Sequence, residues 1–121
     1  MPDVQTDGPR GTPSAAISTR AVQILSEYTG RGPTKVRTTI ARDSVAIVHH
    51  DMGEQTIEAA WEQDGVLRMR QRFQDAVRGE LVALVESNVH RDVIAFMSAS
   101  HIDPDVGVEF FLLKPRENEG P

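Results

Sequence analysis

Cysteine is missing from this chain of 121 residues. Its absence excludes disulfide bonds, thiolate metal ligands and cysteine nucleophiles, and it suits a reducing compartment such as the cytoplasm. Aromatic residues are also scarce, with one Trp, one Tyr and four Phe. A chain of this length buries roughly 60–70% of its unfolded surface, which is enough for one core. We therefore expect a single domain that folds without covalent cross-links.

Long apolar runs are absent as well. A membrane-spanning helix needs about twenty apolar residues, whereas the runs in this chain do not exceed about five. The N-terminal segment "MPDVQTDGPRGTPS" lacks the apolar core of a signal peptide. The formal net charge of −5 argues against a general nucleic-acid binder. These features predict a soluble cytoplasmic protein that does not insert into a membrane.

Composition divides the chain into a central domain and two tails. Residues 1–13 and 115–121 are rich in Pro, Gly and polar groups, so we expect both segments to be disordered. Residues 14–114 contain the periodic apolar patterns and form the expected domain. No internal repeat is evident.

Two segments show the spacing of amphipathic helices. The first begins at Ser14 and ends near Gly30, and its apolar stripe consists of Ile17, Ala21, Ile24, Leu25 and Tyr28. The second is a helix of about twenty residues, marked by Val66, Met69, Phe73, Val77, Leu81, Leu84 and Val85. A short helix is also expected within residues 51–65, ended or kinked by Gly65. Gly79 weakens the long helix by up to about 1 kcal/mol relative to alanine.

The segment "KVRTTIARDSVAIVHH" has the pattern of a β-hairpin. If Arg42 and Asp43 form the turn, three cross-strand pairs share one largely apolar face, namely Ile40 with Val45, Thr38 with Ile47 and Val36 with His49. Residues 92–100 and 106–114 are two further strands, joined by a turn at "HIDPD". The stretch "EFFLL" is apolar on both faces, which predicts that helices or another subunit cover both sides of its strand.

The expected order is α-β-β-α-α-β-β. This order predicts an α+β fold with a mainly antiparallel four-stranded sheet and helices packed on one face.

Neither metal-binding nor catalytic spacing is evident. His49 and His50 are neighbours on a strand and point to opposite faces, so they do not converge on one ion. His101, Asp103 and Asp105 alternate, but the proline between the two aspartates favours a turn. No serine lies in a nucleophile-elbow pattern. We therefore expect no metal, no cofactor and no catalytic residue.

The loop "YTGRGPTKVR" contains the candidate binding residues Gly30, Arg31, Gly32 and Pro33. Such a loop can present backbone N–H groups to an anion. Here, however, a helix leads into the loop, and the negative end of its dipole favours Arg31 itself over a bound phosphate. The main interpretation is a rigid corner between a helix and a strand, with anion or partner binding as the alternative. A basic surface beside the loop would comprise Lys35, Arg37, Arg68 and Arg72.

These motifs resemble one known family. "GRGP" between a first helix and a hairpin, then Glu58 in "QTIEAAW" and two closing strands, is similar to the MpsC-like family over about residues 15–113. The family takes its name from the third component of a sodium-translocating, membrane-potential-generating system, whose membrane partners are linked to bicarbonate or cation uptake. The resemblance implies a soluble accessory component and supplies no catalytic residue.

The leading hypothesis is a non-catalytic accessory or regulatory module that forms a homodimer and contacts membrane transporter subunits. A KH-like nucleic-acid-binding module is one alternative, although the negative net charge argues against it. A small domain that senses an anion or nucleotide through the GRGP loop is the other.

Overall fold

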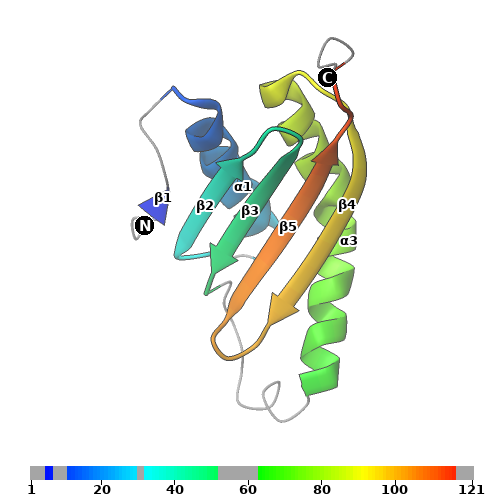
Figure 1. Cartoon of the computed structure of the whole chain (residues 1–121). Coiled ribbons are helices and arrows are strands. Elements are labelled where there is room, and N and C mark those ends of the chain that lie inside the picture. Colours follow the sequence, from blue (N-terminus) through cyan, green and yellow to red (C-terminus); the bar gives the residue numbers. More distant parts are fainter. Residues whose placement is uncertain (1–4, 7–10, 30–31, 52–62, 117–121) are drawn as a thin grey trace.

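The computed structural model describes residues 5–6, 11–29, 32–51 and 63–116, with the backbone alone for 5–6, 28–29, 63–74 and 76. The elements are β1 (Gln5–Thr6), α1 (Pro13–Thr29), β2 (Lys35–Ile40), β3 (Ser44–His50), α3 (Gln63–Val89), β4 (Val93–His101) and β5 (Val106–Leu113). The sheet order is β1-β2-β3-β5-β4. The expected α+β fold is confirmed: β2, β3, β5 and β4 pair antiparallel, and both helices lie behind the sheet in Figure 1.

The hairpin register is confirmed residue by residue. Ile40 pairs with Val45, Thr38 with Ile47 and Val36 with His49. The N–H of Ala41 donates to the carbonyl of Ser44 at 2.8 Å, which closes the turn at Arg42 and Asp43. Since the side-chain period of a strand is two, this register assigns every residue of the hairpin to one face of the sheet.

The N-terminal segment differs from the sequence expectation at two places. Gln5 and Thr6, which the composition assigned to a disordered tail, pair in parallel with Lys35 and Val36 at the outer edge of β2. Unpaired backbone groups on an edge strand can recruit a short segment without any apolar pattern in it. Helix α1 starts at Pro13, one residue earlier than expected, and Thr12 accepts a hydrogen bond from the N–H of Ala15 at 3.2 Å. Threonine at the N-cap followed by proline is a favourable helix start.

The long helix α3 begins before Gly65 and continues through Gly79 to Val89. The expected break at Gly65 is therefore not a helix end. Most of the expected short helix, residues 52–62, lies outside the described residues.

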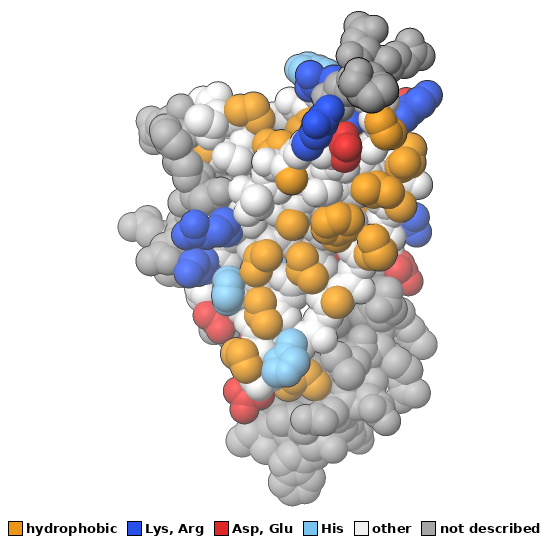
Figure 2. Space-filling view, viewed as in Figure 1, with side chains coloured by type: hydrophobic (Ala, Val, Ile, Leu, Met, Phe, Trp, Pro, Cys, Tyr) orange, Lys and Arg blue, Asp and Glu red, His pale blue; other side chains and the backbone are white. Residues whose placement is uncertain are grey.

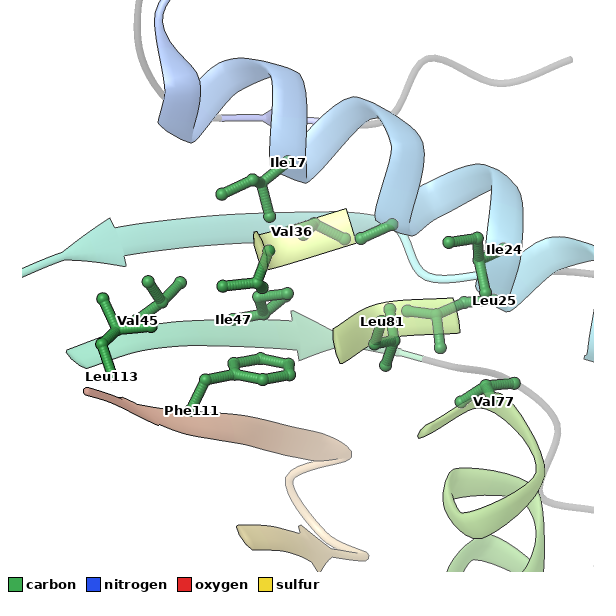
Figure 3. Packing of buried hydrophobic residues seen from close by; sticks show 12 residues of the cluster. Ile17, Ile24, Leu25, Val36, Val45, Ile47, Val77, Leu81, Phe111 and Leu113 are labelled. Atoms are coloured by element: carbon green, nitrogen blue, oxygen red, sulfur yellow. The ribbon is translucent and has the colours of Figure 1, made fainter. Parts of the chain in front are cut away.

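The hydrophobic core lies between the helices and the sheet (Figure 3). The buried apolar side chains of the cluster come from α1, β2, β3, α3 and β5 and are Ile17, Ala21, Ile24, Leu25, Val36, Val45, Ile47, Val77, Leu81, Val85, Phe111 and Leu113. Phe96 of β4 packs against this cluster, with its ring edge-to-face on Phe111 at a centroid distance of 5.1 Å. One polar contact joins α1 to the sheet, since the hydroxyls of Ser18 and Thr38 are 2.7 Å apart and buried.

Gly32 has a positive φ of 81° and lies against α1. A Cβ at this position would be 2.1 Å from Ser26 Oγ and 3.2 Å from Ser26 Cβ. Glycine is therefore required here both by backbone conformation and by the close approach of the loop to the helix.

We expect Gly32→Ala to lower the free energy of unfolding by about 1–3 kcal/mol, because alanine disfavours this φ and its methyl group collides with Ser26. Gly79→Ala is the matched control: no atom lies within 4 Å of its Cβ position, so the substitution should stabilise α3 by up to about 1 kcal/mol. Urea denaturation of both variants checks the two signs. Equal effects of both substitutions would contradict the assigned role of Gly32.

Candidate functional site

One face of the sheet carries the helices, and the described residues leave the opposite face open. The registers align the side chains of this open face in rows across β3, β5 and β4: Ser44–Leu112–Ala95, Ala46–Phe110–Met97, Val48–Val108–Ala99 and His50–Val106–His101. β2 adds Thr39, Arg37 and Lys35 beside the last three rows. We call this surface the open face. Its centre is apolar across three strands, as Figure 2 shows.

Large apolar side chains on and beside the open face are accessible to solvent. Met97 is 55% exposed and Leu112 37% exposed, and Ile94, at the β-bulge that starts β4, is 55% exposed. On β5, Glu109, Phe111 and Leu113 are buried toward the helices, while Phe110 and Leu112 point the other way. Both faces of "EFFLL" thus carry apolar side chains, as expected, but within the described part of the chain only the helix side is covered, so the expected cover on the other side stays a prediction.

Charged side chains lie at the rim of the open face and not at its centre. Lys35 and Arg37, two of the predicted binding residues, share the open face of β2 at the side of the sheet. At one end of the sheet, Arg91 Nη2 forms an ion pair with Asp43 Oδ1 at 2.7 Å and donates to the carbonyl of Lys114 at 2.8 Å. At the other end, the hydroxyl of Thr34 donates to Asp51 Oδ2 at 2.6 Å. These contacts hold the strand ends in place.

The remaining predicted binding residues are placed as follows. Gly32 and Pro33 are buried against the fold and present no open surface. Gly30 and Arg31, and the side chains of Arg68 and Arg72, lie outside the described residues. The anion-binding hypothesis for the loop and the nucleic-acid hypothesis therefore stay predictions.

A buried polar cluster lies under the helices, on the opposite side of the sheet from the open face. His49 Nε2 donates to Glu109 Oε2 at 2.6 Å, and Ser98 Oγ donates to Glu109 Oε1 at 2.6 Å. Glu109 has no exposed surface and His49 is 3% exposed. The imidazole lies over Gly107, where a Cβ would be 2.4 Å from His49 Cε1. A side chain at residue 107 would therefore displace the ring from Glu109.

The order of groups in this cluster differs from that of a nucleophilic triad. In a triad the histidine accepts the serine proton and the carboxylate orients the histidine. Here the carboxylate lies in the middle, and Ser98 donates to Glu109 rather than to His49. His49 Nδ1 is buried without a hydrogen-bond partner in the described structure. The cluster therefore joins β3, β5 and β4 beneath the helices. This cluster was not predicted from the sequence, where its one signal is a glutamate at a helix-facing position of an apolar strand.

The polar side chains of the open face do not converge either. His50 and His101 occupy the same row but are separated by Val106, which places them about 10 Å apart at the usual strand spacing. The expected turn at "HIDPD" is confirmed, and His101 Nδ1 lies 2.9 Å from the carbonyl of Pro104. Within residues 5–6, 11–29, 32–51 and 63–116, no three His, Asp or Glu residues are grouped to hold a metal ion.

None of the described helices combines the length and the apolar character that a membrane-spanning helix needs.

Comparison with known proteins identifies the family. The model of the family described as "Na+-translocating membrane potential-generating system (MpsC)" matches residues 10–115 of the 121. No match was found among curated proteins or among solved structures. The matched range contains the described helices α1 and α3 and the antiparallel strands β2, β3, β5 and β4, so it includes the open face and the buried cluster. The chain therefore belongs to the MpsC family.

Proposed function

We propose that this chain is a non-catalytic accessory subunit of a Na+-translocating, membrane-potential-generating system, and that it works by binding protein through the open face. The family description supplies the process. The open face supplies the mode of action. The lack of cysteine, together with the family process, leads us to place this subunit on the cytoplasmic side of the membrane.

The observation that carries the proposal is the apolar centre of the open face. The apolar centre spans three strands at about 4.8 Å spacing and some six residues at about 3.3 Å rise, which gives about 300 Å² in plan. The largest apolar patch on a typical monomer is about 300–600 Å² and often marks an interaction site. With Met97 and Leu112 exposed and charges confined to the rim, this face has the apolar core and polar rim of a protein interface.

The polar groups on and near the face support binding rather than a reaction. Lys35, Arg37, His50 and His101 are distributed along the rim, where each is accessible to a partner's polar groups. The buried cluster of His49, Glu109 and Ser98 lies on the helix side of the sheet. Its carboxylate accepts hydrogen bonds from both other side chains, so the cluster links three neighbouring strands and supports a structural role.

Everted membrane vesicles test the proposal. Vesicles from cells that lack this chain should lose the Na+-dependent part of the membrane potential, measured with a voltage-sensitive dye. Expression of the wild-type chain or of Ala83→Glu, altered on the exposed side of α3, should restore the signal. Expression of Met97→Glu should not, because it places a charge in the apolar centre of the open face. Full Na+-dependent potential without the chain would refute the proposed process, and full restoration by Met97→Glu would refute the proposed surface.

A further inference from the structure

We propose that the open face binds a second copy of this chain, packed sheet against sheet about a two-fold axis that runs across the strands. This inference rests on the proposed function in one respect, namely that the open face is a protein-binding surface. It adds the identity of the occupant and its orientation. Strands of the two copies that lie over one another then run in opposite directions.

The first argument is the distribution of charge between the two ends of the sheet. Among the described side chains, the end with the β2–β3 turn carries Arg42, Arg91, Lys114 and Arg116 against Asp43, Glu86 and Asp92, a net charge of four minus three, or +1. The end with the β4–β5 turn carries Asp51, Asp103 and Asp105 against Lys35, a net charge of one minus three, or −2. Figure 2 shows Lys and Arg side chains at the upper end of the face and a second group at its left margin, with hydrophobic side chains in the centre. The face therefore has a basic end and an acidic end.

This distribution is self-complementary in one orientation only. A two-fold axis across the strands places the basic end of each copy over the acidic end of the other, and the contact occurs twice. An axis along the strands would place basic over basic and acidic over acidic. Opposite charges across an interface favour the first arrangement, and like charges oppose the second.

The two-fold axis across the strands also matches individual residues. Because it places each strand over the same strand of the other copy, Lys114, which follows β5, comes over the acidic turn of residues 102–105 that precedes β5. Arg37 of β2 comes over Thr39 of the other β2, two residues along the strand from the other Arg37.

The size of the open face suits a dimer. Standard interfaces bury about 800 Å² on each partner, and weak ones bury less. The open face covers several hundred Å² in plan. The side chains that project from it, together with Ile94 at its margin, bring its accessible area toward about 800 Å². Two sheets packed face to face lie about 10 Å apart, with interdigitated apolar side chains. We therefore expect a dimer at micromolar protein concentration.

Sedimentation equilibrium of the full chain tests the surface. We expect Met97→Glu to raise the dimer dissociation constant by about 100-fold or more, because the charge is placed twice in the apolar centre. Ala83→Glu should leave the constant unchanged. Met97 is more than half exposed in the single chain, so circular dichroism of the variant should match that of the wild type. A monomeric wild-type protein, or a Met97→Glu protein that remains dimeric, would overturn the inference.

A mixing experiment tests the orientation. Lys114→Glu and Asp103→Lys should each weaken their own homodimer by about 10-fold, since each places like charges at both ends of the interface. When the two variants are mixed, the glutamate introduced at position 114 of one chain meets the lysine introduced at position 103 of the other. The unaltered Lys114 then meets the unaltered Asp103, so a heterodimer of nearly wild-type affinity should form. A mixture that stays monomeric at the wild-type dimer concentration would exclude this orientation.

The outcomes separate this inference from the proposed function. If the wild-type chain is monomeric but Met97→Glu still fails in the vesicle assay, the open face binds another subunit and only the dimer is wrong. If the chain is dimeric but the vesicle assay is unaffected by its removal, the dimer holds and the proposed process is wrong.

Discussion

Glu109→Leu is expected to lower the free energy of unfolding by about 3–5 kcal/mol, the cost of breaking a buried polar pair by removing one partner. The substitution leaves His49 Nε2 and the hydroxyl of Ser98 without their acceptor inside the protein. Urea denaturation measures this loss of unfolding free energy. The measurement is made in the Met97→Glu background, which we expect to be monomeric, so that dimer dissociation does not contribute.

The double variant His49→Leu/Glu109→Leu is the control for this interpretation. Replacing both members of a buried pair with apolar groups of similar size is often neutral or even stabilising. The double variant should therefore recover most of the stability that Glu109→Leu loses. His49→Leu alone completes the comparison. If the losses of unfolding free energy of His49→Leu and Glu109→Leu simply add in the double variant, the two side chains are not coupled and the proposed structural role of the pair is wrong.

Phe111→Ala is expected to lower the free energy of unfolding by about 3–5 kcal/mol, since it leaves a large cavity in the core. Phe111 is fully buried, and its ring meets Phe96, over which the guanidinium of Arg78 lies 5.1 Å from the ring centroid. Thermal and urea unfolding, again in the Met97→Glu background, measure the loss.

Phe110→Ala is the matched control, because it removes the same ring from the neighbouring residue on the opposite face. We expect a loss of less than about 2 kcal/mol in the single chain, since Phe110 is only partly buried there. In the wild-type background it should weaken the dimer. Equal destabilisation of the single chain by both substitutions would mean that the open face is packed within one chain.

Local pattern was sufficient to predict much of the fold. The alternation in residues 35–50 predicted that Val36, Val45 and Ile47 share one face, and the assumed turn at Arg42 and Asp43 then gave the observed register. The apolar steps in residues 17–25 identified the buried stripe of α1 in the same way. Periodicity succeeds at these sites because each pattern is complete within one helix or one hairpin.

Contacts between distant strands could not be predicted in this way. His49 and Glu109 are 60 residues apart, and they meet only because β5 lies beside β3 in the sheet. The open face has the same origin, since Phe110, Val48 and Met97 form one surface only in the order β3-β5-β4. The apolar residues on both faces of "EFFLL" indicated that the sheet has a second apolar face, but the extent of that face depends on strand order.

The GRGP loop illustrates a different limit. The GRGP sequence is compatible with both a structural corner and an anion site. Gly30 and Arg31, two of its four residues, lie outside the described residues. For Gly32 the structure supplies the physical reason that composition lacked, a positive φ with Ser26 Oγ against the Cβ position.

The open face is the central feature of this account, and a spin label tests it directly. Because the chain has no cysteine, Met97→Cys provides a single attachment site for a nitroxide, with Ala83→Cys on α3 as the control. Face-to-face packing places the two residues 97 about 10–15 Å apart, given about 10 Å between sheets and a small offset along the strands. We predict dipolar broadening of the spectrum at position 97 that disappears on dilution, and none at position 83. Sharp spectra at position 97 at every concentration, or broadening at position 83 alone, would contradict the account.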